Sequence, residues 1–133
     1  MTQHERQWQP VMLGGDVPPP AGAYSPAVRA GEFVFVSGQV PRDPVSGELI
    51  GSDIEAQTRQ VMKNVERALT AAGAALSDVV SVIVYLADSD DWGRFNATYK
   101  EIMPQPYPTR TAVGASLRGI LVEVSAVAYV GRR

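Results

Sequence analysis

The sequence has no cysteine, and its only histidine is His4, close to the first residue. A zinc site, a reactive thiol or a serine–histidine pair therefore cannot be assembled from the residues of one chain. His4 lies among Gln3, Glu5 and Arg6, so we expect it to be a solvated residue of a polar tail. Any chemistry must then use arginine, glutamate, tyrosine, asparagine, serine, water and the backbone.

Long apolar runs are also absent. No stretch approaches the length that spans a bilayer, and no signal peptide precedes the chain, so we expect a cytoplasmic protein without membrane contact. The formal net charge is −2, and the basic residues are scattered along the chain. Because binding to nucleic-acid phosphates uses several clustered basic residues, this composition argues against a nucleic-acid partner.

The 133 residues fit a single domain. Residues 1–20 are polar and then rich in glycine and proline, which predicts an extended, poorly paired lead-in. The ordered domain is therefore expected over residues 21–133. Apolar, β-branched and aromatic residues at 28–30 and 33–37, on either side of Gly31, predict two strands joined by a tight turn.

Two amphipathic helices are predicted. The first begins at a capping box formed by Ser52 and Glu55 and ends at Gly73. Its apolar stripe contains Ile54, Thr58, Val61, Met62, Val65, Ala68, Leu69 and Ala72. The second begins around residues 89–91, and the side chains expected to point inward are Trp92, Phe95, Tyr99, Ile102 and Met103.

The remaining apolar segments complete a sheet. Residues 79–86 show little alternation, which predicts a central strand covered on both faces, and residues 110–116 and 120–130 predict a final hairpin. The resulting order, β-β-α-β-α-β-β, with two helices on one face of a mixed sheet, is a two-layer α+β fold. Because the strands are apolar on both sides, we expect self-association to cover the other face.

Arg110 and Glu123 each place a full charge in a stretch that otherwise has the pattern of a buried strand. Burying an unpaired charge costs several kcal/mol, and an anionic ligand would supply the partner that Arg110 lacks. If the chain reverses near residues 117–119, alternation places residues 110, 112 and 123 on one face of the sheet. The alternative is a plain ion pair between Arg110 and Glu123 that joins two strands.

Five short motifs follow one another along the chain. They are Gly22-Ala23-Tyr24-Ser25-Pro26, Phe35-Val36-Ser37-Gly38-Gln39-Val40-Pro41, Gly47-Glu48, Asp91-Trp92 with Phe95-Asn96-Ala97-Thr98-Tyr99, and Tyr107-Pro108-Thr109-Arg110-Thr111. With these motifs the chain resembles, from about Ala21 to Val130, the RidA/YjgF family of imine deaminases, labelled in older usage the L-PSP endoribonuclease family.

The resemblance implies the chorismate-mutase-like form of the α+β fold and a homotrimer with ligand clefts between subunits. It also implies hydrolysis of reactive 2-imino acids and enamines to 2-keto acids and ammonia, without a metal or organic cofactor. Arg110 would bind the substrate carboxylate in a bidentate manner, and Glu123 would position or activate the attacking water. The same resemblance assigns to the substrate cleft Tyr24, Ser37, Asn96 and the backbone of Ala112.

Three of these residues have simpler interpretations from the sequence alone. Tyr24 can be a packed aromatic residue beside a turn, Ser37 the polar end of a strand, and Asn96 a solvated helix residue.

The chain also departs from the family pattern. Ala112 stands where many members carry cysteine, Ser125 replaces a second acidic residue, and the connection at 117–120 is shorter than usual. These departures keep open a second hypothesis, a non-catalytic small-molecule binding or regulatory module of the same fold. Ribonuclease action is a third hypothesis, which the acidic balance and the lack of an active-site histidine disfavour.

Overall fold

The computed structural model describes residues 6–131, so the prediction for His4 lies outside the described residues. The strands are β1 (Trp8–Val11), β2 (Ala27–Ala30), β3 (Phe33–Gln39), β4 (Val79–Leu86), β5 (Thr109–Gly114) and β6 (Val122–Tyr129). The helices are α1 (Ile54–Ala71) and α2 (Trp92–Ile102). A short 3-10 turn at Leu76–Asp78 precedes β4, and another at Ser89–Asp91 precedes α2.

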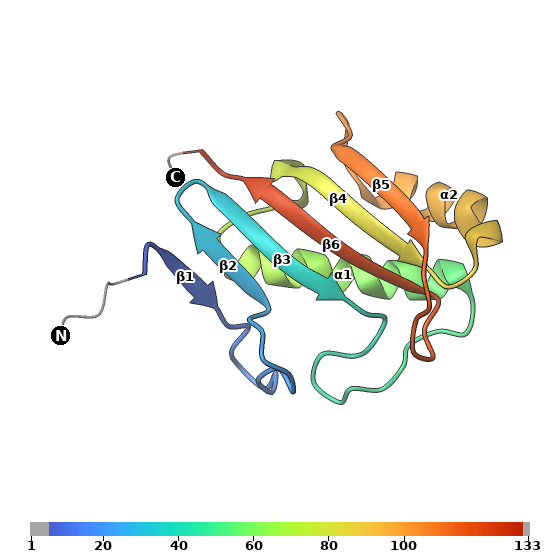
Figure 1. Ribbon diagram of the computed structural model, residues 1–133, viewed down its shortest axis with the longest axis horizontal. Helices are drawn as coiled ribbons and strands as arrows, with labels where there is room; N and C mark the ends of the chain where they lie inside the picture. Colours follow the sequence, from blue (N-terminus) through green and yellow to red (C-terminus); the bar gives the residue numbers. More distant parts are fainter. Residues whose placement is uncertain (1–5, 132–133) are drawn as a thin grey trace.

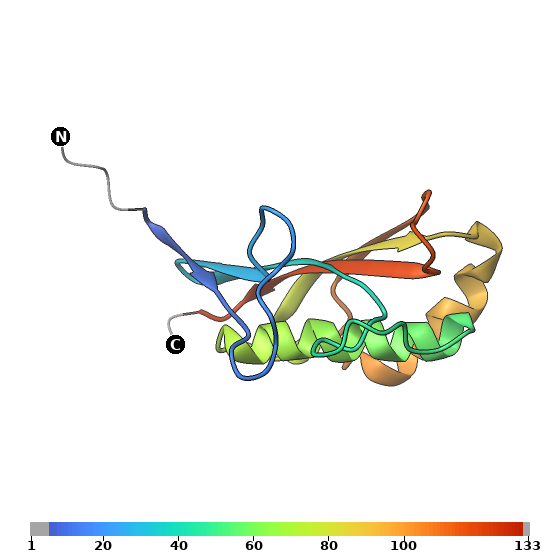
Figure 2. The same ribbon diagram turned by 90° about the horizontal axis from the view of Figure 1, so that it is seen from below.

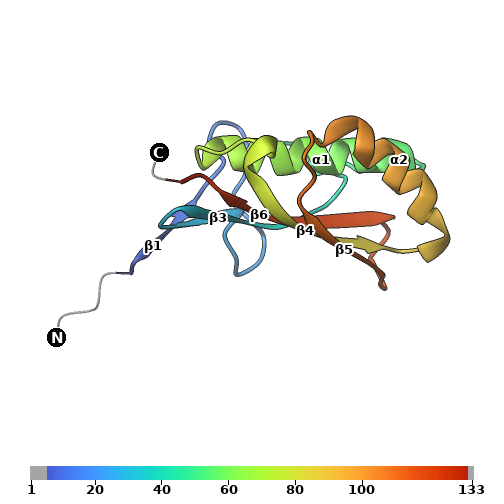
Figure 3. The ribbon, with the colours of Figure 1, turned by 90° about the horizontal axis from the view of Figure 1, so that it is seen from above.

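The strands form one six-stranded sheet in the order β1-β2-β3-β6-β4-β5 (Figure 1). Neighbouring strands are antiparallel except β4 and β5, which are parallel. Both helices lie on the same face of this sheet, and the other face carries no helix (Figures 2 and 3). The predicted two-layer α+β fold, with two helices on one face of a mixed sheet, is confirmed.

The predicted order contains no strand before residue 28, whereas β1 extends the sheet beyond β2. Trp8 lies opposite Ala30, and Val11 lies opposite Ala27. The polar start and the glycine- and proline-rich residues 14–20 gave the segment the pattern of a lead-in. The strand nevertheless includes Pro10, because a proline that cannot donate to a ladder is tolerated at the edge of a sheet. The structure therefore pairs part of the segment that the sequence predicted to be poorly paired.

The final hairpin is the main error of the sequence-based prediction. β5 and β6 both form, but β4 lies between them: Val82 of β4 is level with Arg110 on one side and with Ala126 on the other. The helix α2 connects β4 to β5, and a crossover of that kind joins parallel strands. β6, whose alternate residues are fully buried, takes an inner position, and the more exposed β5 takes the edge.

Helix α1 covers the middle of the sheet, and all of its predicted stripe residues are buried. The predicted capping box is wrong in its cap: Asp53, not Ser52, is the N-cap, and its carboxylate accepts from the N–H of Ala56 at 2.8 Å. Gly73 follows the helix with φ +83°, as predicted for a residue that must adopt the left-handed conformation.

Phe95 and Tyr99 of α2 are buried in the core as predicted, and so is Met103, the C-cap residue of the helix. Trp92 was predicted to be inward, but it is 46% exposed in the single chain, at the first position of the helix. Its indole ring instead lies close to the guanidinium of Arg110.

The face of the sheet opposite the helices carries apolar side chains that the single chain leaves exposed. In β4, Val84 is 0% exposed on the helix side, whereas the next residue back, Ile83, is 39% exposed on the open side. The register of the sheet places on the same open side Trp8, Phe33, Phe35, Val113 and Tyr129. Coverage of this open face by a second copy stays a prediction.

Candidate functional site

Arg110 lies on the helix side of β5, under α2. Its Nη1 donates to Asn96 Oδ1 at 2.8 Å. The guanidinium carbon also lies 4.9 Å from the ring centroid of Tyr99, 5.5 Å from that of Trp92 and 5.9 Å from that of Phe95. These distances permit cation–π attraction, so three rings and one amide of a single helix hold the guanidinium in place.

The charge of Arg110 has no acidic partner within residues 6–131. The ion pairs in this part of the chain join Arg59 to Glu101 and Arg94 to Glu55, and both are on exposed surfaces of the helices. Arg110 is half-buried, and its hydrogen-bond acceptor, Asn96, is neutral. Most of its N–H groups remain available, and a planar guanidinium binds a carboxylate through two parallel hydrogen bonds.

A cavity of about 390 Å³ opens beside this guanidinium. Its walls come from α2 and from the segment that enters β5, and they are formed by Asn96, Tyr99, Lys100, Tyr107, Pro108 and Arg110. The volume is in the range of cavities that hold small molecules. The arrangement is therefore suited to a small organic anion.

Tyr99 contributes a buried polar group to the same wall. The residue is 3% exposed, and its hydroxyl has no hydrogen-bond partner. Burial raises the pKa of the Tyr99 hydroxyl, while the nearby charge of Arg110 opposes that rise. Since the balance favours the neutral form, the hydroxyl keeps its proton.

Glu123 lies on β6 opposite Tyr85, on the open side of the sheet, and is half-buried. Its carboxylate occupies the space beside Gly38: a Cβ at that residue would overlap Glu123 Oε2 and lie 3.0 Å from its Cδ. Gly38 belongs to an irregular stretch of β3, between Val36 and Gln39, where the register with β6 shifts. The bulge and the missing side chain together give the carboxylate its position.

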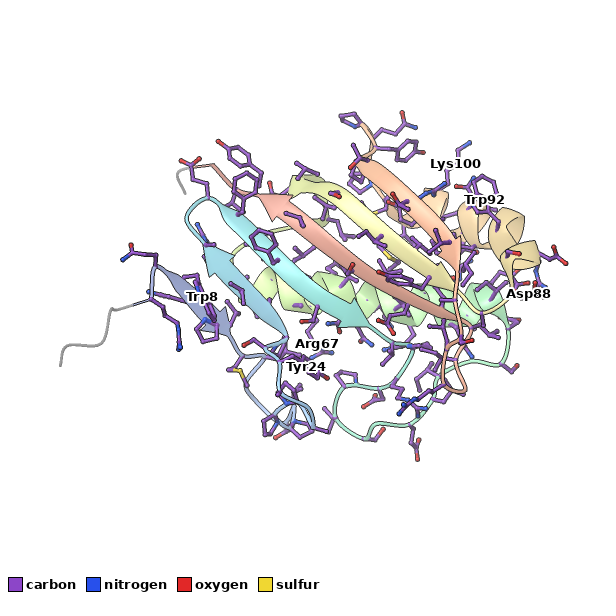
Figure 4. The ribbon with its side chains drawn as sticks, in the orientation of Figure 1. Trp8, Tyr24, Arg67, Asp88, Trp92 and Lys100 are labelled. Carbon is purple, nitrogen blue, oxygen red and sulfur yellow. The ribbon has the colours of Figure 1, made fainter. Side chains whose placement is uncertain are left out.

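Ser37 and Tyr24 lie at the same end of β3. The Ser37 hydroxyl donates to the carbonyl of Ser25 at 2.6 Å, and its N–H donates to the carbonyl of Pro26 at 3.0 Å. Ser37 thus ties the 24–26 segment to the strand. Tyr24 is 58% exposed and lines, with Gly38, a second cavity of about 360 Å³. Figure 4 shows Tyr24 on the far side of the molecule from Trp92 and Lys100.

The predicted site residues therefore fall into two groups. Arg110, Asn96 and, two residues along β5, Ala112 lie on the helix side, with Ala112 half-buried opposite Val84. Tyr24, Ser37 and Glu123 lie around the end of β3. The prediction that residues 110, 112 and 123 share one face is correct for the first two and wrong for Glu123.

The distance between the groups follows from the sheet. Glu123 is two strands away from Arg110 and three residues further along. Neighbouring strands lie about 4.8 Å apart and residues advance about 3.3 Å, so the Cα atoms are separated by roughly 10 Å in each direction. The two side chains also project from opposite faces. The alternative of a plain Arg110–Glu123 ion pair within one chain is therefore excluded.

Comparison with known proteins identifies the family of this chain. The family model described as endoribonuclease L-PSP matches residues 15–130. The chain belongs to the endoribonuclease L-PSP family. The resemblance to the RidA/YjgF family, which is the same family under another label, is thus confirmed.

Named relatives of this L-PSP family chain include one with a described activity. A 2-iminobutanoate/2-iminopropanoate deaminase of Mus musculus is 39% identical over 116 residues, covering 86% of each chain. A RutC family protein of Pyrococcus horikoshii is 43% identical over 121 residues, covering 90% of this chain and 96% of the relative. The crystal structure of RidA from the Antarctic bacterium Psychrobacter sp. superposes with a TM-score of 0.83 at 34% identity, covering 92% of this chain and 98% of that one.

Sequence reasoning missed several residues of the two groups. Tyr99 was assigned to the core only, and Lys100 received no role, although they follow Asn96 at positions i+3 and i+4 and so share its helix face. Gly38 was noted only within a motif. Within residues 6–131, no group of three or more His, Asp or Glu side chains is arranged to hold a metal ion. Over the same residues, neither helix is long and apolar enough to cross a membrane.

Proposed function

We propose that this chain hydrolyses small 2-imino acids, and their enamine tautomers, to 2-keto acids and ammonia. The observation that carries the proposal is the Arg110 guanidinium, which is half-buried, held by a neutral amide and aromatic rings, and open to a cavity of about 390 Å³. The name of the mouse relative supports the same reaction. The 2-carboxylate of the substrate would form two hydrogen bonds with Arg110.

The proposed reaction uses one water molecule. The water oxygen adds to C2 of the imine, and the proton it loses passes to a carboxylate acting as general base. The same carboxylate returns this proton to the nitrogen, which gives a carbinolamine with a hydroxyl and an amino group on C2. It then carries the hydroxyl proton to the nitrogen as well, so that the C–N bond breaks, ammonia leaves and the C2 oxygen becomes the keto group. Glu123 is the acidic residue that we assign to this role, with Tyr24 and Ser37 around it.

Arg110 and Glu123 of one chain lie too far apart, on opposite faces, to hold the same small substrate. We therefore propose that the cleft forms between two subunits, with Arg110, Asn96 and Ala112 from one copy and Glu123, Ser37 and Tyr24 from the next. The exposed apolar open face of the sheet supports such an assembly, because monomers rarely leave a continuous apolar surface in water. A homotrimer, as is typical of the family, is the assembly we expect.

The second candidate is a binding or regulatory module that takes up a keto or amino acid without converting it. The specific observation in its favour is that the cavity beside Arg110 in one chain is lined by two basic residues and by no acidic residue that could act as a general base. If the subunits did not bring a carboxylate to this cavity, binding would be its only activity.

The test is the rate of loss of freshly generated 2-iminopropanoate and 2-iminobutanoate with the wild-type protein, Arg110→Ala and Arg59→Ala. Arg59 is an exposed arginine of α1, and its exposed ion pair with Glu101 contributes little to the stability of the fold. Rapid hydrolysis that Arg110→Ala abolishes and Arg59→Ala retains would support the deaminase. Saturable, Arg110-dependent binding of the keto acids with no acceleration of hydrolysis would replace it with the binding module.

A further inference from the structure

A second basic side chain, that of Lys100, lines the cavity beside Arg110. Of its six lining residues, Arg110 and Lys100 are basic and none is acidic. Lys100 lies one helical turn after Asn96, the residue that accepts a hydrogen bond from Arg110. Lys100 is exposed, and both basic side chains border the same cavity.

Lys100 forms no ion pair within residues 6–131. The nearest acidic residue in sequence, Glu101, bonds to Arg59 of α1 at 3.0 Å. A lysine in the last turn of a helix is favourable for the helix dipole, and this accounts for its residue type. It does not account for its place in the wall of a cavity that already holds an unpaired guanidinium.

Two tyrosines also line the cavity. The Tyr99 hydroxyl is buried without a hydrogen-bond partner, and Tyr107, which is 46% exposed, lies on the segment that enters β5. A ligand with one carboxylate satisfies Arg110 alone. A ligand with a second anionic group would also engage Lys100.

We propose that Lys100 makes this cavity selective for 2-imino acids whose side chain ends in a second carboxylate. This inference rests on the proposed function and names the substrate class of the same site. The four- and five-carbon members, 2-iminosuccinate and 2-iminoglutarate, carry two carboxylates and can therefore contact two basic side chains at once. Their second carboxylate lies against Lys100 while the first is held by Arg110.

The experiment compares kcat/KM for freshly generated 2-iminosuccinate and 2-iminoglutarate with that for 2-iminopropanoate and 2-iminobutanoate. The variants are Lys100→Gln and, as the matched control, Lys63→Gln. Lys63 is an exposed lysine on α1, outside this cavity, and its replacement changes the net charge equally. We expect Lys100→Gln to lower the ratio of dicarboxylate to monocarboxylate kcat/KM by about three- to tenfold, the range of a partly exposed charge-assisted contact. Lys63→Gln should keep the wild-type ratio.

A ratio that Lys100→Gln leaves unchanged, or that both variants lower equally, would overturn the selectivity while leaving the deaminase intact. Binding of the products separates the two proposals further. Calorimetry with 2-ketoglutarate and 2-ketobutanoate measures the role of Lys100 without turnover. If none of the four imines is hydrolysed, a loss of 2-ketoglutarate affinity confined to Lys100→Gln still supports the contact with Lys100. Equal 2-ketoglutarate affinities of Lys100→Gln and the wild-type protein overturn it.

Discussion

The carboxylate of Glu123 lies against the backbone of Gly38, in the space that the side chain of any other residue would occupy. The backbone conformation of Gly38 does not require glycine, since its φ lies outside the left-handed region. The requirement for glycine comes from the close approach of the carboxylate. This contact links the bulge in β3 directly to the group that we propose to activate water.

Replacing Gly38 with alanine should therefore displace the Glu123 carboxylate. The overlapping atom is the end of a flexible side chain, so the fold can relax and the unfolding free energy should fall by only about 1 kcal/mol. We expect kcat for imine hydrolysis to fall about tenfold or more, because small misplacements of a catalytic group have large effects. Steady-state kinetics and urea denaturation check both parts.

Gly93→Ala is the matched control for this substitution. Gly93 lies in the first turn of α2, with no atom within 4 Å of the added Cβ, and alanine favours the helix. It should retain wild-type kcat. Retention of full activity by Gly38→Ala would show that the position of the Glu123 carboxylate does not matter for turnover.

Asn96 should matter because its side chain is neutral. In Asn96→Asp, a carboxylate would take the place of the amide oxygen that lies 2.8 Å from Arg110 Nη1, and the new ion pair would compete with the substrate carboxylate. We expect KM to rise about tenfold or more, while the unfolding free energy does not fall. Asn96→Ala, which removes the acceptor without adding charge, should raise KM less and lower stability. A wild-type KM in Asn96→Asp would contradict carboxylate binding by Arg110.

The hydroxyl of Tyr99 should lower the stability of the ligand-free protein. A buried hydroxyl without a partner loses its hydration, so Tyr99→Phe should raise the unfolding free energy by about 1 kcal/mol with an unchanged denaturant m-value. Tyr129→Phe is the comparison, since that hydroxyl donates to Glu32 Oε2 at 3.1 Å and its removal should not stabilise. Destabilisation by Tyr99→Phe would show that the hydroxyl has a partner in solution.

The helices could be predicted from the sequence because their signal is local. The stripe from Ile54 to Ala72 repeats at the helical period, and each of its members is buried. The pairing of strands was less predictable. Alternation in 122–129 shows which residues share a face, but nothing in it shows that β4, rather than β5, is the neighbour of β6. That choice depends on the α2 crossover, which joins segments distant in the sequence.

The same limit applies to the candidate site. The charges of Arg110 and Glu123 stand out in apolar segments, and the motifs identified both residues. Their positions on opposite faces depended on strand order, so the predicted common patch was wrong. Gly38 makes room for the Glu123 carboxylate because it has no side chain, and the sequence pattern does not indicate such a role. Lys100 and Tyr99 share the helix face of Asn96, but only the three-dimensional cavity shows that this face is functional.

The separation of Arg110 and Glu123 leads to a test by subunit mixing. Arg110→Ala and Glu123→Gln should each be nearly inactive alone, since each removes one half of every cleft. If each cleft combines Arg110 of one copy with Glu123 of the next, mixed oligomers contain some clefts in which both residues are intact. For a closed ring with random equal mixing, about a quarter of the clefts are restored, and activity should recover to a similar fraction of wild type.

The control is a mixture of the same two variants that has not been unfolded and reassembled, in which subunits have not exchanged. Native mass spectrometry would establish that mixed oligomers have formed. If they form and no activity returns, Arg110 of one copy and Glu123 of the next do not share a cleft. Since β4 separates the two residues within one chain, that result would remove Glu123 from the proposed contact with the substrate.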